Sequence, residues 1–410
     1  MIYLDSNATT RPSPAVRAAL LPYVGDSHAN AKSLHGPGEA ARAAVEAARE
    51  KVAALLCARA RDVVFTSTAT EALNTIVRGL LLREPPDARR HVVASAVEHP
   101  AVAEPLQDLE TRGYEVTRVG VDGAGRLDPE EFRAALRGDT ALSIAMAANN
   151  ETGVRLPWRE CAAAAREKGV PYLCDAVQAA GKVPFEFEDS GADYAVISSH
   201  KIHGPMGAAA LVVRRSAPFR PLLVGGGQER GRRAGTENVA AIVGFGVACE
   251  EATRHLVESM PRVEKLKDRL ESLLVERIDG LKVNGLGAPR LPNTLSVVIG
   301  GVEGEAALLL LDKEGIAVST GSACASGSMD PSHVLTAMGI PVPLSLGALR
   351  FSLSRTTTEA DVLAAAEALP RVVKKLRELS PFDPLDGPPQ DRFGTKTAPD
   401  AARAARRSSE

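Results

Sequence analysis

Seven short runs of apolar and β-branched residues, separated by segments with helical periodicity, limit most strongly how this chain can fold. Such alternation is typical of a mainly parallel sheet whose faces are covered by crossover helices. Gly, Pro and Asp stand at the joints between the runs, where they favour turns. We therefore expect an α/β fold with strands over 62–67, 91–96, 115–120, 141–147, 171–176, 194–199 and 209–215, and with helices over 38–56 and 157–169.

The pattern changes towards the C-terminus. Residues 238–278 have apolar side chains at helical spacing and predict one or two long helices, with Pro261 breaking or starting a segment. Beyond them, short strands and helices interleave in an α+β manner. We therefore expect a large domain over 16–260 and a smaller α+β domain over 261–380. The first 15 residues contain a lone strand that we expect to pack with the small domain, and the composition of 381–410 predicts a disordered tail.

Composition excludes several classes of protein. Of the 410 residues, 45% are hydrophobic and 24% are charged, and the net charge is −2, which argues against a general binder of nucleic acids or anionic membranes. No apolar run approaches the roughly 18 residues of a membrane-spanning helix. The N-terminus has no basic region and already carries Asp5, so we expect no signal peptide and a cytoplasmic location. The five cysteines contain no C-x-x-C pair and are expected to be reduced.

Two of the predicted strands end in residues suited to one cofactor. Asp175 closes the strand at 171–176, and Lys201 follows the strand at 194–199, between His200 and His203. In open α/β folds, ligands bind at the carboxyl edge of the sheet, where these side chains would lie. Enzymes that use pyridoxal phosphate (PLP) need a lysine that binds the cofactor and a carboxylate that keeps its pyridine nitrogen protonated. Taken singly, Lys201 could be an ordinary surface lysine and Asp175 a helix N-cap.

Two segments could bind a phosphate group. The turn Thr68-Ala69-Thr70-Glu71 follows the first predicted strand and fits a capping box, and the N-terminus of a helix attracts anions. The same pattern is satisfied by a well-capped helix without a ligand. The glycine-rich segment 225–236 contains three arginines, which suit an anion, although a mobile surface loop is the alternative.

Further polar residues follow predicted strands. His99 comes after the strand at 91–96, where an imidazole could stack on a flat ring and exchange protons, or could simply cap a helix. Asn150 follows the strand at 141–147. Arg350 lies on a predicted strand of the small domain, and arginine is the residue that best binds a substrate carboxylate with two hydrogen bonds.

One cysteine stands apart from the others. Cys324 lies in a Gly- and Ser-rich segment at 318–335, where small neighbours leave a thiol accessible and the backbone free to move. Accessibility is what a reactive thiolate requires. Cys57, Cys161, Cys174 and Cys249 lie in predicted helices or strands, and we expect them in the core.

Taken together, these motifs resemble cysteine desulfurases of the iron–sulfur-assembly type, which belong to the class V aminotransferase group of fold-type-I PLP enzymes. The resemblance covers about residues 1–375. It rests on motifs in a set order: "YLDSNATT", "FTSTATEALN", "VEHPAV", "NNETG", "DAVQAAGK", "SSHKIHGPMG", "GGGQERGRRAGTEN", "STGSACASGS" and "LRFSLSRTTTE".

The resemblance implies a role for each matching residue and no metal site. Lys201 would bind PLP covalently, Asp175 would contact the pyridine nitrogen, Gln178 would donate to the phenolic oxygen of the ring, and His99 would stack on it. Asn150 and Arg350 would orient the substrate. The phosphate binders would be Ala69, Thr70, Ser198 and His200, together with Thr236 from a second copy of the chain in a homodimer.

The implied reaction converts L-cysteine to L-alanine and transfers the sulfur to Cys324 as a persulfide. An acceptor protein in iron–sulfur cluster assembly, thio-cofactor synthesis or tRNA thiolation would then take the sulfur. The segment around Cys324 would be the long, mobile loop of this type. Two alternatives stay open: a selenocysteine lyase or another class V PLP enzyme such as an aminotransferase or an epimerase, and a non-catalytic sulfur-relay subunit with the same fold.

Overall fold

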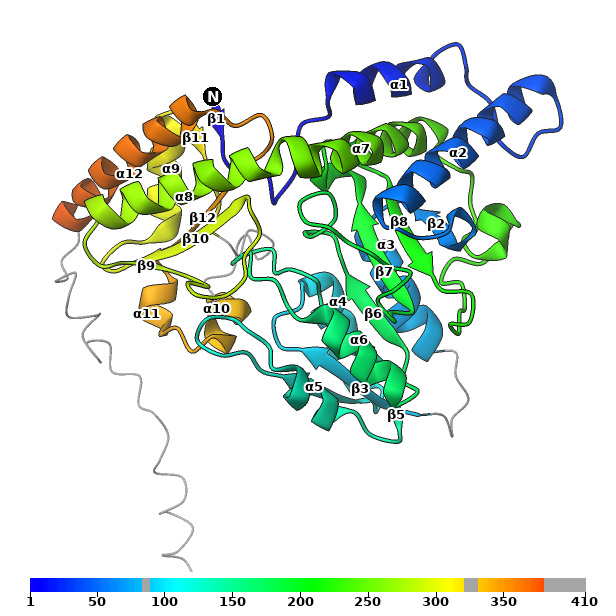
Figure 1. The fold of residues 1–410 in the computed structure, drawn as a ribbon, viewed down its shortest axis with the longest axis horizontal. Helices are drawn as coiled ribbons and strands as arrows, with labels where there is room; N and C mark the ends of the chain where they lie inside the picture. Colours follow the sequence, from blue (N-terminus) through cyan, green and yellow to red (C-terminus); the bar gives the residue numbers. More distant parts are fainter. Residues whose placement is uncertain (83–88, 321–330, 380–410) are drawn as a thin grey trace, which may run out of the picture.

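The main body of the protein is a seven-stranded sheet covered by helices on both faces (Figure 1). The computed structural model describes residues 1–82, 89–320 and 331–379. The strands of the sheet lie in the order β2-β8-β7-β6-β5-β3-β4. All seven predicted strands are confirmed, as β2 Val63–Thr66, β3 His91–Ser95, β4 Glu115–Val119, β5 Thr140–Ile144, β6 Tyr172–Asp175, β7 Tyr194–Ser198 and β8 Ala209–Val213.

Most of this sheet is parallel. Strands β3, β4, β5, β6 and β7 pair in parallel, and β8 runs antiparallel to both of its neighbours, β7 and β2. The carboxyl ends of β3, β5, β6 and β7 therefore meet at one edge. The predicted α/β class with a mainly parallel seven-stranded sheet is confirmed.

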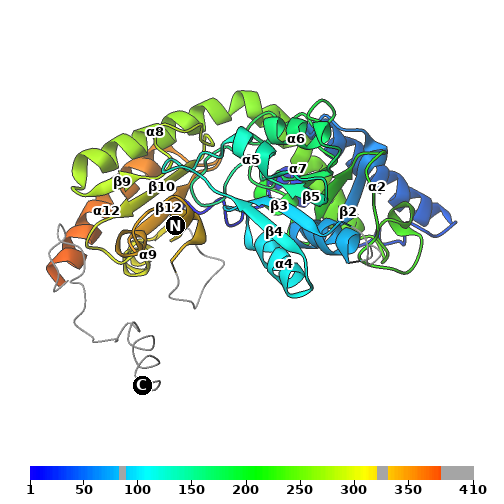
Figure 2. The same cartoon turned by 90° about the horizontal axis from the view of Figure 1, so that it is seen from below.

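Alternate residues of each strand supply two separate hydrophobic layers, because successive side chains of a strand point to opposite faces. In β6, Tyr172 and Cys174 belong to the cluster that contains residues of α2 and α7, whereas Leu173 belongs to the cluster under α3 and α4. The view in Figure 2 has α6 and α7 on one side of the sheet and α4 on the other. Burial on both faces explains why the strands are continuous apolar runs.

The helices around the sheet follow the predicted pattern. The segment predicted at 38–56 forms α2, and that at 157–169 forms α6. The long segment 238–278 divides into two helices, with Pro261 as the second residue of the latter, where its missing N–H has no helical partner to lose. The helices are α1 Pro14–Val24, α2 Gly36–Leu55, α3 Ala69–Asn74, η2 Thr75–Leu80, α4 Pro100–Thr111, α5 Pro129–Ala135, α6 Trp158–Glu167, α7 Val239–Glu258 and α8 Met260–Arg277, with short turns η1 Ala60–Asp62, η3 Ser199–Lys201 and η4 Gln228–Gly231.

A second, smaller body has its own sheets and its own hydrophobic cluster. Strand β10 (Thr294–Ile299) pairs antiparallel with β9 (Leu281–Val283) and β12 (Ala348–Ser352). The N-terminal strand β1 (Ile2–Tyr3) pairs in parallel with β11 (Ile316–Ala317) of this body, as Figure 1 shows. The remaining helices are α9 Gly304–Lys313, α10 His333–Ala337, α11 Val342–Ser345 and α12 Glu359–Leu379. The domain limits at 15, 260 and 380 stay a proposal, and the tail 381–410 lies outside the described residues.

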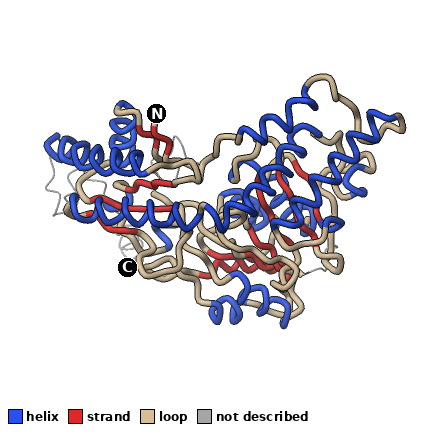
Figure 3. Tube along the Cα trace, turned by 45° about the horizontal axis from the view of Figure 1, so that its top comes forward, coloured by secondary structure: helices blue, strands red, loops and turns tan. Residues whose placement is uncertain are grey.

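The long helices α7 and α8 follow one another from the large body into the small one (Figure 3). No helix within the described ranges has the length and apolar character needed to cross a membrane. Helix α7 packs closely on α2, since a Cβ atom added at Gly246 would lie 2.7 Å from Cα of Ala48. Such an approach leaves room only for a glycine.

We predict that Gly246→Ala destabilises the protein by about 1–3 kcal/mol, the usual effect of overpacking a core, because α7 must move away from α2. Thermal or urea denaturation would measure this loss. Gly36→Ala, at the first residue of α2, is the matched control, because nothing lies within 4 Å of an added Cβ there. Equal stability of the two variants would contradict the prediction.

Candidate functional site

Polar residues from several elements meet at the carboxyl edge of the large sheet. Asp175 ends β6, and Lys201 lies in the short turn η3 that follows β7. His99 follows β3 and Asn150 follows β5. The charge of Lys201 acts on both Asp175 and His99: it opposes the burial that raises the pKa of Asp175, and it adds to the burial that lowers the pKa of His99. The topology of the sheet therefore assembles residues that are far apart in sequence.

Asp175 is buried and has one oxygen open to a ligand. Its Oδ1 accepts a hydrogen bond from the backbone N–H of Val177 at 2.9 Å, and Oδ2 has no such partner in the described part of the chain. Burial raises the pKa of Asp175 to about 6, against the opposing effects of the Val177 N–H and the Lys201 charge. The carboxyl group is therefore mainly ionised at neutral pH. It closes a local turn, and no helix begins there, so the N-cap alternative is wrong.

The amino group of Lys201 is held by the N-terminal segment. Its Nζ donates to the backbone oxygens of Asn7, at 2.6 Å, and Ala8, at 2.7 Å. The same segment is tied to the loop around Lys201, since the N–H of Thr10 donates to the backbone oxygen of His200 at 2.8 Å. Residues near the start of the chain thus form one wall of the site.

Asn7 contacts both bodies. It was not predicted as a site residue, although it lies in the quoted motif "YLDSNATT". Its Nδ2 donates to the backbone oxygen of Asn150, at 3.1 Å, and to Oγ1 of Thr294 in β10, at 2.9 Å. Its Oδ1 accepts from Lys182 at 3.2 Å and from Asn293 at 3.1 Å. An amide next to Ala-Thr-Thr, directly after a lone strand, was the available signal.

His99 is a neutral imidazole of defined tautomer. It is the N-cap of α4, where its Nδ1 accepts from the N–H of Ala101 at 3.0 Å. Burial, followed by the charges of Lys201 and His333, lowers the pKa of His99 to about 4. Because Nδ1 accepts a hydrogen bond in the neutral ring, the proton must be on Nε2. His99 therefore caps a helix, as the alternative had it, and it also lies close enough to Lys201 to feel its charge.

Glu98, next to His99, is a buried acid that sequence reasoning missed. Its Oε1 accepts from Oγ of Ser95 at 2.5 Å and from the N–H of Met146 at 2.8 Å, while Oε2 has no partner among the described residues. Burial is the main cause that raises the pKa of Glu98 to about 8, with a smaller contribution from Asp175. Glu98 is therefore mostly a neutral carboxylic acid at pH 7.

Arg350 reaches the site from β12 of the smaller body. Its guanidinium is buried and donates to the backbone oxygen of Asn150 at 3.0 Å and to Oδ1 of Asp5 at 2.8 Å. Asp5 was not predicted as part of the site. A planar guanidinium that already binds one carboxylate has the geometry to bind the carboxylate of an amino acid.

The turn before α3 departs in one detail from the predicted capping box. Oγ1 of Thr68 accepts from the N–H of Glu71 at 3.0 Å, as predicted, but the Glu71 carboxylate accepts from Ser67 rather than from Thr68. The N–H groups of Ala69 and Thr70 lie in the first turn, where no helical partner exists. They are the donors that a phosphate group would need.

The other predicted phosphate binders lie on two further segments. Ser198 is buried at the end of β7, and Nδ1 of His200 lies 3.1 Å from Oγ1 of Thr9. Burial, followed by the charges of Lys201 and Lys182, lowers the pKa of His200 to about 4, so its ring is neutral.

The glycine-rich segment 225–236 is anchored by ion pairs. Glu229 and Arg49 form a buried pair at 2.7 Å, and Arg233 binds Glu71 at 2.8 Å. Arg230 is paired with Glu46, so two of the three arginines hold glutamates. Thr236 is exposed, and its hydroxyl has no hydrogen-bond partner within the residues described. The exposed position leaves Thr236 able to contact another chain.

Three of the cysteines expected in the core are buried there, namely Cys161, Cys174 and Cys249. The expectation for Cys57 is wrong, because this thiol is exposed. Cys57 lies beyond the end of α2 with φ of 47°, a left-handed conformation common just after a helix, so it is not part of the buried helix face.

Cys324 lies outside the described residues, but the segments on both sides of it contact the site. Ser319 forms main-chain hydrogen bonds with Arg350 at 2.7 and 3.2 Å. Oγ of Ser332 donates to Glu151 at 2.6 Å, and Nε2 of His333 donates to the backbone oxygen of Glu98 at 2.9 Å.

Comparison with known proteins gives the class to which this fold and site belong. Residues 2–364 match the family model described as aminotransferase class-V, and the chain therefore belongs to that family.

Within the family, the chain is similar to proteins named for one reaction. It is 49% identical over 382 residues to a cysteine desulfurase of Trichormus azollae, covering 93% of this chain and 95% of that protein. A solved "NifS-like protein" superposes with a TM-score of 0.83 at 37% identity, covering 92% of this chain and 98% of the other. The structure titled "SspA in complex with cysteine" superposes with a TM-score of 0.78 at 30% identity, covering 87% and 100%.

The donor set fits the cofactor that this family implies. A basic pyridine nitrogen needs a buried carboxylate with an open oxygen, which Asp175 provides. A phosphate needs unpaired N–H groups, which the first turn of α3 provides, and an aldehyde needs an amine, which Lys201 provides. The residues present are therefore chemically suited to PLP.

We predict that Glu98→Gln flattens the pH dependence of stability. A carboxyl group whose pKa is raised in the folded state costs stability as pH rises through about 4.5 to about 8, because the unfolded chain ionises first. This slope is at most about 1.4 kcal/mol per pH unit, and Gln, which stays neutral, removes it. Unfolding free energies of the cofactor-free protein between pH 4.5 and 8 would measure it. Glu104→Gln, at an exposed position of α4, is the control and should keep the wild-type slope.

Proposed function

We propose that this protein is a PLP-dependent cysteine desulfurase that converts L-cysteine to L-alanine and transfers the sulfur to Cys324. The observation that carries the proposal is the meeting of Lys201, Asp175 and Arg350 at one edge of the sheet, linked through Asn7, Asp5 and Asn150. The relatives named cysteine desulfurase at 49% identity, and the related structure that holds cysteine, support the substrate.

Different residues of the site would bind the cofactor and the substrate. PLP, when bound, supplies an electron sink that allows bonds at Cα and Cβ of the substrate to break. Lys201 would hold it covalently, Asp175 would accept from its ring nitrogen, and His99 would stack on the ring. Gln178 would donate to its phenolic oxygen, and the phosphate would lie against Ala69, Thr70, Ser198 and His200. Arg350 and Asn150 would bind the substrate, with its carboxylate on the guanidinium.

Lys201 and His99 are the residues proposed to transfer protons. The amine of Lys201 would take the proton from Cα, because the backbone oxygens of Asn7 and Ala8, which accept from its Nζ, hold the free amine in the site. His99 offers an N–H at Nε2 and has its other nitrogen bound to Ala101. In its resting state it therefore acts more readily as a donor than as a base towards a thiol.

Cys324 is the proposed sulfur acceptor. Its thiolate attacks the sulfur of the substrate, so that an S–S bond forms as the Cβ–S bond breaks, and Cβ gains a proton. The products are L-alanine and a Cys324 persulfide, which balances the atoms of L-cysteine and the thiol without an external oxidant. The contacts of Ser319 with Arg350 and of Ser332 with Glu151, on either side of Cys324, support its access to this site.

Partners and location are part of the same proposal. A homodimer would let Thr236, exposed in the single chain, contribute to the phosphate site of the second copy. An acceptor protein of iron–sulfur cluster assembly or another thiolation pathway would take the persulfide sulfur in the cytoplasm. A selenocysteine lyase is the second candidate, since Lys201, Asp175 and Arg350 would serve it equally well.

We predict that Cys324→Ala retains PLP and its visible absorption band but loses at least about 100-fold in alanine formation from L-cysteine with dithiothreitol, because no thiol takes the sulfur. Alanine and sulfide assays would measure the loss. Cys57→Ala removes the exposed thiol beyond α2 and should be fully active. An active Cys324→Ala enzyme would overturn this role, and activity on selenocysteine alone would favour the lyase.

Lys201→Ala is expected to abolish covalent attachment of PLP, because Lys201 is the residue to which the proposal assigns the covalent bond. Treatment with borohydride followed by mass spectrometry would detect the reduced adduct in the wild type and in Lys168→Ala, a control at an exposed lysine after α6. An adduct that persists in Lys201→Ala would refute the assignment. A colourless wild-type protein that cannot be loaded with PLP would favour a non-catalytic relay subunit.

A further inference from the structure

Lys182 is a buried lysine to which the reaction above assigns no task. The residue is 7% exposed, and it has no ion pair in the described part of the chain. Burial, followed by the positive charges of Lys201 and Arg350, lowers its pKa well below the ordinary value for lysine. A buried cation next to two others is costly, so the surroundings favour the neutral amine.

The contacts of Lys182 determine how the amide of Gln178 is oriented. Nζ of Lys182 donates to Oε1 of Gln178 at 2.5 Å. The other side of the amide, Nε2, donates to the backbone oxygen of Asn7 at 3.0 Å, and the same oxygen accepts from Nζ of Lys201 at 2.6 Å. The amide nitrogen of Gln178 therefore faces Lys201, and the amide oxygen faces Lys182.

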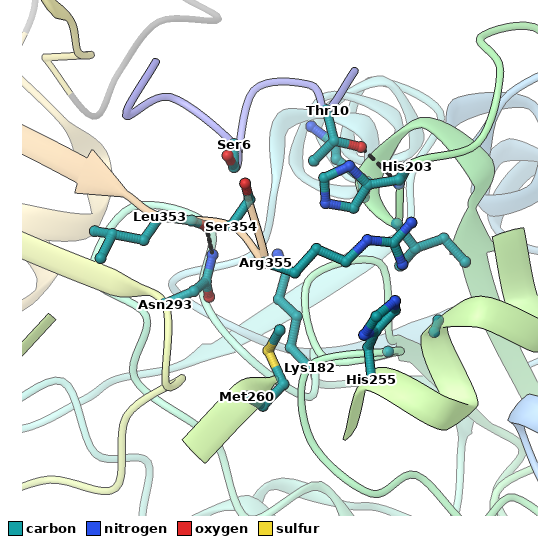
Figure 4. A pocket seen from close by; sticks show the side chains of 14 residues that line it. Ser6, Thr10, Lys182, His203, His255, Met260, Asn293, Leu353, Ser354 and Arg355 are labelled. Atoms are coloured by element: carbon teal, nitrogen blue, oxygen red, sulfur yellow. Dashed lines mark hydrogen bonds between the residues drawn. The ribbon is translucent and has the colours of Figure 1, made fainter. Parts of the chain in front are cut away.

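The space beside Lys182 is small and is lined by side chains of both bodies. Lys182 and Lys201 both line a cavity of about 30 Å³, which has room for one or two water molecules. Figure 4 shows Lys182 and Arg355 extending into this region, with Asn293 on one side and with His203 and His255 on the other. Of these residues, Asn293 uses its Nδ2 on Asn7 and on the backbone oxygen of Leu353, both at 3.1 Å.

We propose that Lys182 is a positioning residue that fixes the amide of Gln178, so that its N–H side faces Lys201 and the bound PLP ring. Lys182 acts through Gln178 and does not touch the substrate. Without this donor, Oε1 of Gln178 loses its hydrogen bond from Lys182, and only the bond from Nε2 to the backbone oxygen of Asn7 still orients the amide. This inference rests on the proposed function, in which Gln178 donates to the ring.

The test is a double-mutant cycle read on the PLP-loaded enzyme. Lys182→Met, which has a similar volume and no donor, is expected to shift the visible PLP band in the same direction as Gln178→Met and to weaken PLP binding about tenfold. The variant Q178M/K182M should match Q178M alone, because the two residues act as one unit. Lys182→Gln keeps an N–H donor and should retain the wild-type band.

Lys267→Met is the matched control, because Lys267 is a buried lysine of α8 in the smaller body, where it pairs with Asp268 at 2.8 Å. It should leave the band unchanged whatever it does to stability. A wild-type band in K182M, additive shifts in the double variant, or a shift in K182Q as large as that in Q178M would overturn the proposal. A wild-type chain with no PLP band would instead overturn the proposed function.

Discussion

The backbone oxygen of Asn7 is the point on which the site depends, because it accepts hydrogen bonds from both Lys201 and Gln178. The side chain of the same residue binds the large body through Asn150 and the smaller body through Thr294. The short N-terminal segment therefore connects two bodies that have separate hydrophobic clusters. Its strand β1 pairs with β11 of the smaller body. Removal of this segment would take away the acceptors that Asn7 provides to Lys182, Gln178, Lys201 and Asn293, which is costly in a site of low dielectric.

Burial decides the charge of most groups around this point. It raises the pKa of Asp175 to about 6 and of Glu98 to about 8, and it lowers that of His99 to about 4. In each group desolvation is the largest cause: in Asp175 and Glu98 it outweighs opposing hydrogen bonds, and in His99 the charges of Lys201 and His333 act in the same direction. At pH 7 an ionised Asp175 therefore lies in the same site as a neutral Glu98 and a neutral His99, which limits the buried charge of the site.

The sequence predicted the strands and the ends of the strands well, because apolar runs and turn residues are local signals. Lys201 and Asp175 were found for the same reason, since each directly follows or ends such a run. Cys57 was placed wrongly, because it lies beyond the end of α2 in a left-handed conformation, where helical periodicity no longer applies. Glu98 and Lys182 were missed, because an acid or a lysine in a sequence does not reveal that the folded chain excludes water around it. The cofactor roles of the matching residues stay predictions.

The sequence by itself determined the class of fold and the family, because both follow from the order of short motifs and from periodicity along the chain. Tertiary structure alone decided which groups meet. Asn7 and Thr294 are 287 positions apart, and Arg350 and Asp5 are 345 apart, yet each pair forms a hydrogen bond. Such contacts depend on how the two bodies pack, and the burial that neutralises Glu98 and His99 depends on tertiary packing as well. No local sequence pattern encodes these contacts or this burial, because both arise only when segments distant in sequence pack together and exclude water.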